Sequence, residues 1–426
     1  MDLGAGAAAE QAARASYGKL LAFLAAQTRD LAAAEDALAD AFASALESWP
    51  KTGVPRSPEG WLVTAARRKL IDAARRARTR EAGVGQLAMA LDEARQLTLA
   101  REDIPDERLR LIFACAHPAI DAAARAPLIL QTVLGFDARA IASAFLVAPA
   151  AMSQRLVRAK SKIRDAGVPF RTPDLSALPE RLEAVLDAVY AVFTQGWADP
   201  AGADARTRGL TDEAIWLGRL IAAILPGEPE ALGLLALMLH ADARRAARRG
   251  GDGRYVPLDD QDPALWDRGR MTEAERLILA ASAMGRVGRF QLEAAIQSAH
   301  ASRALTGRAD WEAILTLYDG LLALTGSIVV AINRAVALAR VRGPAEGLAA
   351  LDAVSADPRL MDYQPYWAAR AEVLARAGEA PAADAAYQRA IGLESDPALR
   401  AFLQVRRAET EASFSPSSLP ASARRP

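Results

Sequence analysis

Residues 60–80 read G-W-L-V-T-A-A-R-R-K-L-I-D-A-A-R-R-A-R-T-R, and the apolar residues of this stretch recur at helical spacing. Leu62, Ala66, Leu70 and Ala73 fall on one side, which predicts a helix that packs on a core along that side. The remaining positions carry one acid, Asp72, among basic residues: Arg67, Arg68, Lys69, Arg75, Arg76, Arg78 and Arg80. The stretch therefore predicts an amphipathic helix with a strongly basic exposed side.

The charge of this helix is local, because the whole chain is neutral, with 52 lysines and arginines against 52 acidic residues. Positive charge gathered on one helix favours a polyanion such as a nucleic-acid backbone. A solvated basic surface without a ligand is the alternative interpretation. Trp61, at the helix start, can stack on an unpaired base or anchor the core, and the sequence leaves both open.

The composition predicts helices throughout, because alanine and leucine dominate a hydrophobic content of 52% while aromatic and β-branched residues are sparse. A length of 426 residues suggests about two to four domains. The single cysteine, Cys115, allows no internal disulfide and has the apolar neighbours of a buried structural thiol. The first residues lack the pattern of a secretory signal, and the most apolar segment, 231–241, is too short to span a bilayer. We therefore expect a soluble cytoplasmic protein without a membrane segment.

Residues 17–49 predict two helices with a break near residues 28–30. The second helix has an acidic side without basic residues, formed by Asp30, Glu35, Asp36, Asp40 and Glu47. Because a negative surface repels nucleic acid, we expect this side to face a protein partner or solvent. The loop W-P-K-T-G-V-P-R-S-P-E-G then leads to the basic helix.

A second basic region begins at residue 105. Residues 138–145 predict a short helix, residues 146–148 a turn, and Pro149 the start of a longer helix, which together have the organisation of a helix-turn-helix. We expect four apolar residues to seat the longer helix: Met152, Leu156, Val157 and Ile163. Its polar residues are Ser153, Gln154, Arg155, Arg158, Lys160, Lys162 and Arg164. Such a helix can enter the major groove of DNA, and a generic two-helix hairpin is the alternative.

The region from residue 168 onward predicts more helices around one distinctive loop, residues 248–267, which reads R-R-G-G-D-G-R-Y-V-P-L-D-D-Q-D-P-A-L-W-D. The loop lacks the ligand ladder and closing glutamate of a calcium site, although it contains Asp252, Asp259, Asp260 and Asp262. We interpret it as a polar loop that docks two helical blocks, with metal or catalytic acid chemistry as the alternative. No metal site is predicted, because the spacing of a metal-binding motif is absent around His117, His240 and His300.

Residues 366–393 carry a repeat signal. Small residues that permit close helix contact combine with aromatics at the spacing of a tetratricopeptide helix pair, at Trp367, Ala371, Gly378, Ala383, Tyr387 and Ala390. Weaker versions occur upstream, at residues 281–296 and 332–352. The signal predicts a tetratricopeptide-like helical end, and the composition of residues 411–426 predicts a disordered tail.

Taken together, an acidic helix, a basic helix that opens with tryptophan, a linker and a basic helix-turn-helix resemble the two conserved domains of a bacterial sigma-70-type factor of the extracytoplasmic-function group. The stretch A-E-D-A-L-A-D-A-F is similar to region 2.2 of that family, and W-L-V-T-A-A-R-R-K-L-I-D-A-A-R-R is similar to its regions 2.3 to 2.4. The stretch V-A-P-A-A-M-S-Q-R-L-V-R-A-K resembles the recognition helix of region 4. The loop and the tetratricopeptide-like end resemble a subgroup with a large helical domain fused to the sigma core.

The resemblance implies binding roles without catalysis, cofactor or metal. The β′ clamp of RNA polymerase would be bound by Glu35, Asp36 and Asp40. The minus-ten promoter element would be held by Trp61, Arg67, Arg68, Lys69, Asp72, Arg75 and Arg76. The minus-35 element would be read by Ser153, Gln154, Arg155, Arg158 and Lys160. The β flap of the polymerase would be a further contact, and the tetratricopeptide-like end offers a site for a protein or ligand partner.

The sequence thus predicts an all-α chain of five parts. A sigma region 2 domain at residues 10–80 is followed by a linker at 81–104 and a region 4 helix-turn-helix domain at 105–167. A helical extension at 168–410 and the tail at 411–426 complete the chain. Because the extension is fused to the sigma core, we expect it to control that core within the same chain.

The sequence is compatible with three classes of function. The leading hypothesis is a promoter-specificity subunit that binds core RNA polymerase and promoter DNA. A helical-repeat adaptor that binds a protein or peptide is the second hypothesis. An enzyme that uses the loop at residues 248–267 is the third, and the absence of a recognisable nucleophile, metal cluster or phosphate loop in the sequence weighs against it.

Overall fold

The computed structural model describes residues 5–81, 107–145, 147–171, 178–198 and 209–414. Within these ranges the chain is helical, with no strand beyond one isolated antiparallel bridge between Arg249 and Tyr255. The all-α class predicted from the composition is therefore confirmed. None of the helices in the described ranges is long and apolar enough to cross a membrane.

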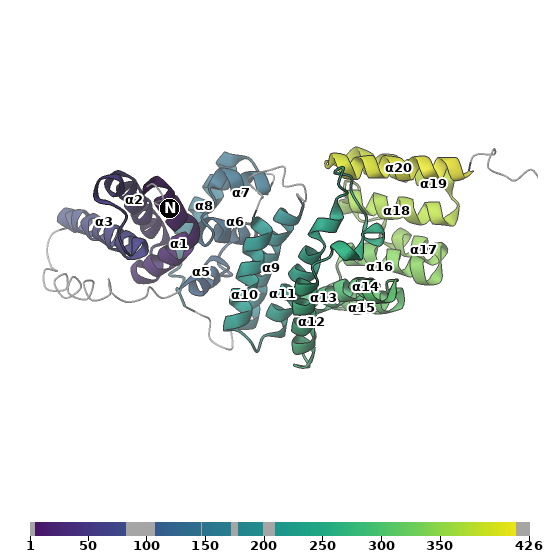
Figure 1. Cartoon of the computed structure of the whole chain (residues 1–426), viewed down its shortest axis with the longest axis horizontal. Coiled ribbons are helices and arrows are strands. Elements are labelled where there is room, and N and C mark those ends of the chain that lie inside the picture. The colour runs from purple at the N-terminus through teal and green to yellow at the C-terminus, as the bar shows by residue number, and fades with distance from the viewer. Residues whose placement is uncertain (1–4, 82–106, 146, 172–177, 199–208, 415–426) are drawn as a thin grey trace, which may run out of the picture. The chain divides into compact units, whose positions relative to one another are not determined.

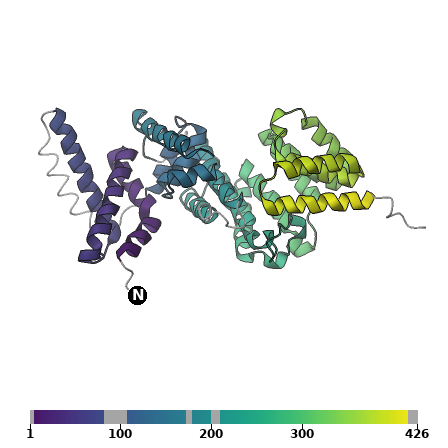
Figure 2. The ribbon, with the colours of Figure 1, turned by 90° about the horizontal axis from the view of Figure 1, so that it is seen from above.

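The first three helices are α1 (Ala5–Thr28), α2 (Leu31–Thr52) and α3 (Pro58–Glu81), and they pack on one another (Figures 1 and 2). The predicted break near residues 28–30 is confirmed. Arg29 adopts a left-handed conformation with φ of 55°, and the side chain of Asp30 caps α2 by accepting from the backbone N–H of Ala33. Helix α2 continues past Pro50 into the segment predicted as a loop and ends before Gly53, whose φ is 83°.

The next four helices are α5 (Arg108–Cys115), α6 (Ala122–Thr132), α7 (Ala138–Ala144) and α8 (Pro149–Asp165). Helices α7 and α8 lie where the two helices of the second basic region were predicted. Met152, Leu156 and Ile163 are buried as expected, but Val157 is 62% exposed. The reason is geometric, because residue 157 lies about 100° around the helix from residue 156 and Ala159 completes the buried stripe instead.

The described chain folds into two compact units, and the boundary between them differs from the boundary predicted at residue 167. The first unit ends at Leu220 and the second begins at Ile221, within helix α10 (Leu210–Ile224). Helix α9 (Leu178–Ala198) belongs to the first unit because it packs on α5 and α6, where Arg181 donates a hydrogen bond to the backbone carbonyl of Phe113. The apolar pattern of α9 shows that one side is covered, but it does not specify which neighbours cover it.

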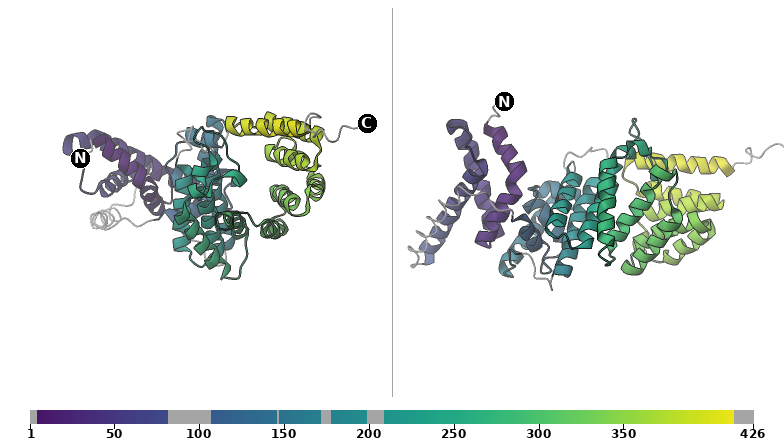
Figure 3. Two further views of the ribbon diagram at one scale, coloured as in Figure 1. Left: turned by 45° about the vertical axis from the view of Figure 1, so that its right-hand side comes forward. Right: turned by 60° about the horizontal axis from the view of Figure 1, so that its bottom comes forward.

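The second unit is a succession of helices in which each packs mainly on its neighbours in sequence. Figure 3 shows them following a curved row from α12 to α20. The first complete helix of the unit is α11 (Pro229–Ala243), which is buried over almost its whole length. The remaining helices are α12 (Arg268–Ser282), α13 (Arg289–Ala301), α14 (Arg303–Thr306), α15 (Trp311–Thr325), α16 (Ile328–Arg342), α17 (Pro344–Val354), α18 (Gln364–Ala377), α19 (Ala380–Leu393) and α20 (Pro397–Phe414).

Helix α20 is longer than the sequence suggested, because residues 411–414, assigned to the tail, are helical. Arg407 and Glu411 form an ion pair of 3.3 Å one turn apart, which favours continuation of the helix. The rest of the predicted tail, residues 415–426, lies outside the described residues, as does the predicted linker from residue 82 to 104.

Candidate nucleic-acid interface

The basic helix α3 has one packed side and one open side over residues 58–72. Leu62, Val63 and Ala66 are buried, and α3 packs on α1 and α2. Arg68, Lys69 and Asp72 are exposed. Arg75 and Arg76 lie on the same helix, but their side chains are outside the described residues. The open side can therefore meet a polyanion without any change in how the helix packs.

Arg67 differs from its neighbours because it braces α3 against α1. Its Nε and Nη2 donate hydrogen bonds to Gln27 Oε1 at 3.3 and 3.0 Å, and its guanidinium lies over the ring of Phe23, 5.1 Å from the centroid. These contacts orient the side chain in advance. Arg67 thus stabilises the packing of α3 on α1, whereas Arg68 is exposed.

Trp61 lies against Trp49 in an edge-to-face arrangement, with ring centroids 5.6 Å apart and planes at 70°. Trp49 is 1% exposed, whereas Trp61 is only partly buried. An aromatic pair of this geometry stabilises by about 0.5–1.5 kcal/mol beyond the area it buries. Trp61 is therefore anchored at the core while part of its side chain stays accessible, which combines the two interpretations left open by the sequence.

The three acids expected to bind a protein partner have different surroundings on α2. Asp36 is exposed. Asp40 is also exposed and lies 3.5 Å from Lys69 of α3, so the acidic and basic helices are linked at this point. Glu35 forms an ion pair with Lys160 of α8, with 16% and 12% of the two side chains exposed. The three acids therefore differ: Asp36 is exposed, Asp40 is exposed but paired with Lys69, and Glu35 is mostly buried in its pair with Lys160.

Tyr17 of α1 is a neighbour of Glu35 that the sequence did not single out. Burial and the nearby charge of Glu35, which also hydrogen-bonds the tyrosine, raise the pKa of Tyr17 well above its usual range. The phenol is thus protonated and donates to the carboxylate. In the sequence, the contact with Glu35 is indicated only by a tyrosine hydroxyl within an otherwise apolar helix. Many buried tyrosines share that feature, so it does not identify the partner.

Helix α8 presents an exposed row that contains Ser153, Gln154 and Arg158. Arg155 is partly buried and donates to the backbone carbonyl of Ala123 at 3.4 Å. Lys160, expected on the same DNA-reading surface, points to Glu35 instead. The residues predicted to read DNA therefore do not form one surface. Ser153, Gln154 and Arg158 are exposed, whereas Lys160 contacts Glu35 of α2.

The six residues of the repeat signal come together in the hairpin of α18 and α19. Four of them, Ala371, Ala383, Tyr387 and Ala390, form a buried cluster, and Trp367 packs against it. The indole N–H of Trp367 donates to the backbone carbonyls of Leu360 and Met361, both at 3.1 Å. Gly378 ends α18 in the left-handed conformation, with φ of 85°.

The loop at residues 248–267 connects several helices of the second unit. Asp259 accepts from Arg340 of α16 at 2.7 Å, and Arg303 of α14 donates to the backbone carbonyls of Asp259 and Gln261. Arg249 forms an ion pair with Asp396, just before α20. These contacts agree with the interpretation of a polar loop that docks helical blocks.

The cysteine and two of the histidines pack against neighbouring side chains of the fold. Cys115 is fully buried, its Sγ lies 3.4 Å from Thr132 Oγ1, and burial raises the pKa of its thiol to about 12. His240 lies 3.3 Å from Glu275, and His300 packs edge-on against Trp311. No group of three or more His, Cys, Asp or Glu side chains placed to hold a metal ion occurs among the described residues.

Comparison with known proteins gives two family matches. Residues 13–80 match sigma-70 region 2, and residues 181–282 match a family of unknown function (DUF6596). An uncharacterized protein of Rhizobium meliloti (strain 1021) is 40% identical over 382 residues, which are 88% of this chain and 90% of that protein. No solved structure matches. The sigma-70 match contains α2 and most of α1 and α3, the helices that carry the acidic and basic surfaces.

Proposed function

From the match of residues 13–80 to sigma-70 region 2, we propose that the chain is a sigma factor of the sigma-70 family that recognises two promoter elements with its two basic helices. The family binds core RNA polymerase and promoter DNA and acts in transcription initiation. In this chain, we assign those contacts to exposed residues of α2, α3 and α8.

The exposed side of α3 supports recognition of the minus-ten element. Arg68 and Lys69 project from a helix whose other side is buried, so their charges can meet phosphates without a change in packing once Lys69 leaves its exposed pair with Asp40. Trp61 lies at the start of the same helix with part of its side chain accessible, where an extruded base can stack on it. Arg67, oriented by Gln27 and Phe23, would add a fixed cation.

The exposed row on α8 supports recognition of the minus-35 element in the major groove. Ser153 and Gln154 lie in the first turns of the helix, where side chains reach base edges in this type of docking. Arg158 lies one turn further and would contact the phosphate backbone. Val157 is exposed on the same helix and can pack against a thymine methyl group.

Asp36 and Asp40 are our candidates for docking on the polymerase β′ clamp, because both are exposed on α2, and Asp40 would exchange its partner Lys69 for the clamp. Glu35 would join them only after its contact with Lys160 is broken. We also propose that the chain is of the extracytoplasmic-function group and that its tetratricopeptide-like second unit controls the sigma domains.

In vitro transcription tests the proposal. Core RNA polymerase would be supplied with the full-length chain and a library of promoter fragments, in parallel with an Arg68→Ala/Lys69→Ala variant. We expect selective initiation by the first and at least about tenfold less by the second, since each lost phosphate contact lowers affinity. The matched control is Arg359→Ala, which removes an exposed arginine paired with Asp357 outside these surfaces.

A truncated chain that ends at Pro226 separates regulation from promoter recognition. This end point keeps α9 and the part of α10 up to Leu220, which belong to the first compact unit and which an end at residue 167 would have removed. A change in initiation in either direction supports control by the second unit, and unchanged initiation contradicts it. Silence from both the full-length and the truncated chain would instead favour the adaptor hypothesis.

A further inference from the structure

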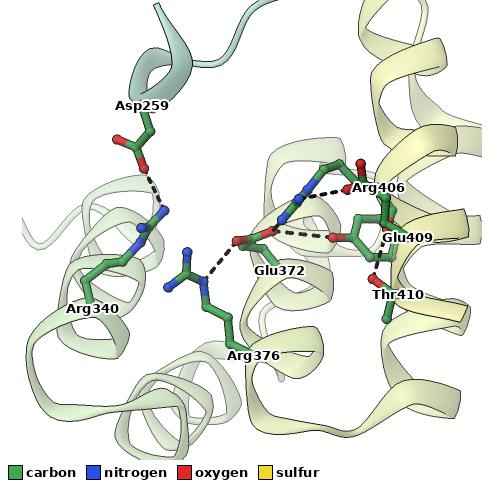
Figure 4. A network of polar contacts seen from close by, with 8 residues as sticks. Asp259, Arg340, Glu372, Arg376, Arg406, Glu409 and Thr410 are labelled. Atoms are coloured by element: carbon green, nitrogen blue, oxygen red, sulfur yellow. Dashed lines mark hydrogen bonds and ion pairs between the residues drawn. The ribbon is translucent and has the colours of Figure 1, made fainter. Parts of the chain in front are cut away.

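The second unit contains a hollow of about 410 Å³ that the proposed sigma function does not use. Helices α16, α18, α19 and α20 line it, and the loop at residues 257–260 lies against these helices and completes the lining. Three arginines from three different helices line it, Arg340, Arg376 and Arg406, and Figure 4 shows them around Glu372. We call this hollow the arginine groove.

The helices that form the groove carry more positive than negative charge. Glu372 accepts from Arg376 at 2.9 Å and from Arg406 at 3.0 Å, and Arg406 also contacts Glu409 at 2.9 Å. Among the residues that line the groove, three arginines face one glutamate of the helices, Glu372, and the loop supplies the other two carboxylates. Of these, Asp259 accepts from Arg340 at 2.7 Å (Figure 4). The charge balance of the groove is therefore completed by a segment of peptide rather than by another helix.

The loop is bound in the manner of a peptide ligand. Arg340 binds the carboxylate of Asp259, while Arg303 donates to the backbone carbonyls of Asp259 and Gln261. Both guanidiniums are oriented by indole rings, Arg340 over Trp311 at 5.0 Å and Arg303 over Trp266 at 5.4 Å from the centroids. Arginines oriented in advance lose less entropy when they bind a carboxylate or a carbonyl.

The part of the groove that does not contact the loop can bind further groups of a ligand. Arg376 and Arg406 keep 38% and 40% of their side chains exposed. Ala368, Phe402 and Leu403 add apolar surface beside them. A ligand with carboxylates next to an apolar residue would match both kinds of surface.

We propose that the arginine groove is the binding site for an extended acidic peptide segment of a partner protein, and that residues 256–261 are its built-in occupant. An aspartate or glutamate of the partner takes the place of Asp259 on Arg340, its backbone carbonyls replace those on Arg303, and a second carboxylate reaches Arg376. This inference is independent of promoter recognition and names the class of partner that the second unit binds.

The test measures fluorescence anisotropy of a labelled peptide, V-P-L-D-D-Q-D, which copies residues 256–262, with the full-length chain. In the wild-type chain the internal loop competes. We expect the Asp259→Asn/Asp260→Asn variant to bind the peptide about tenfold more tightly, because its own loop has lost the competing carboxylates. Adding Arg340→Gln to that variant should remove this gain, again by about tenfold.

Matched controls come from the same loop and from the peptide. Asp252→Asn makes the same chemical change at an exposed residue that pairs with Arg254 and does not line the groove, so affinity should equal that of the wild-type chain. A peptide with asparagine in place of its three aspartates should not bind. Circular dichroism of each variant reports whether the helices are intact.

Arg376→Gln gives a second reading, because Arg376 is a partly exposed side chain that makes a one-turn pair with Glu372. Placed in the Asp259→Asn/Asp260→Asn background, it should weaken peptide binding about threefold. Equal binding of the acidic and neutral peptides, or no gain in the Asp259→Asn/Asp260→Asn variant, would overturn the proposal whether or not the chain directs transcription.

Discussion

Lys160 of α8 and Glu35 of α2 form an ion pair between residues 125 positions apart in the sequence. The sequence assigned these residues to different partners, Lys160 to promoter DNA and Glu35 to the polymerase clamp. Because each is the other's partner in the structure, neither can make its expected contact while the pair is formed. The pair therefore links the two sigma surfaces in the free chain.

Breaking this pair should destabilise the first unit. Both side chains are more than four-fifths buried, so Glu35→Gln leaves Lys160 with a poorer partner, and we expect a loss of about 2 kcal/mol in the free energy of unfolding. Urea denaturation of the full-length chain measures this change. The exchanged variant Glu35→Lys/Lys160→Glu should recover part of the loss, and the exposed Asp36→Asn should stay within about 0.5 kcal/mol of the wild-type value. Equal effects of Glu35→Gln and Asp36→Asn would show that the pair contributes nothing.

Two exposed residues of α8 should affect promoter binding in different ways. Gln154→Ala removes a side chain placed to read a base edge, so we expect relaxed specificity at one promoter position with a cost of about 1–3 kcal/mol on the preferred sequence. Arg158→Ala should weaken binding to all sequences alike and lower the salt dependence by about one counterion. Binding of holoenzyme to promoter variants over a range of salt concentrations distinguishes them. The assignment fails if both substitutions alter the sequence preference, or if neither alters binding.

Two glycines of the hairpin formed by α18 and α19 should respond oppositely to alanine. Gly378 has φ of 85°, a conformation that strains any residue with a Cβ, so Gly378→Ala should destabilise by about 1 kcal/mol. Gly392 is inside α19 and has open space where a Cβ would be placed, so Gly392→Ala should stabilise by up to about 1 kcal/mol. Thermal unfolding of the two variants and the wild-type chain measures both changes, with a lower unfolding temperature expected for Gly378→Ala and a higher one for Gly392→Ala. Shifts of the same sign would contradict this assignment of backbone strain.

Stability should fall in acid because of His300. Burial, with Arg244 nearby, lowers the pKa of this imidazole to about 4, while in the unfolded chain its pKa is about 6.5. The stability due to the neutral side chain is therefore complete above about pH 6.5 and is lost as the pH falls towards about 4, by about 3 kcal/mol in total. Denaturation midpoints between these pH values should fall more steeply for the wild-type chain than for His300→Gln. Parallel curves for the two chains would place the acid sensitivity in other groups.

Much of the local structure was predictable because its determinants lie within a few residues of each other. The break after Thr28 depends on the capping side chain of Asp30, and the start of α8 depends on Pro149. The apolar spacing of Leu62 and Ala66 likewise showed which side of α3 is packed. The binding roles of the exposed side chains remain predictions, since exposure alone does not identify a ligand.

The sequence by itself determined the all-helical class, the position of the helices in its strongly patterned stretches and the separation of apolar from charged sides, because helical periodicity and caps act over one or two turns. Only the tertiary structure decided that Glu35 meets Lys160, that Arg340 meets Asp259, and that α9 belongs to the first unit. Each of these depends on which apolar sides pack together across long separations in the chain. Periodicity shows that a side is covered, but the choice of partner follows from the shapes of the assembled helices.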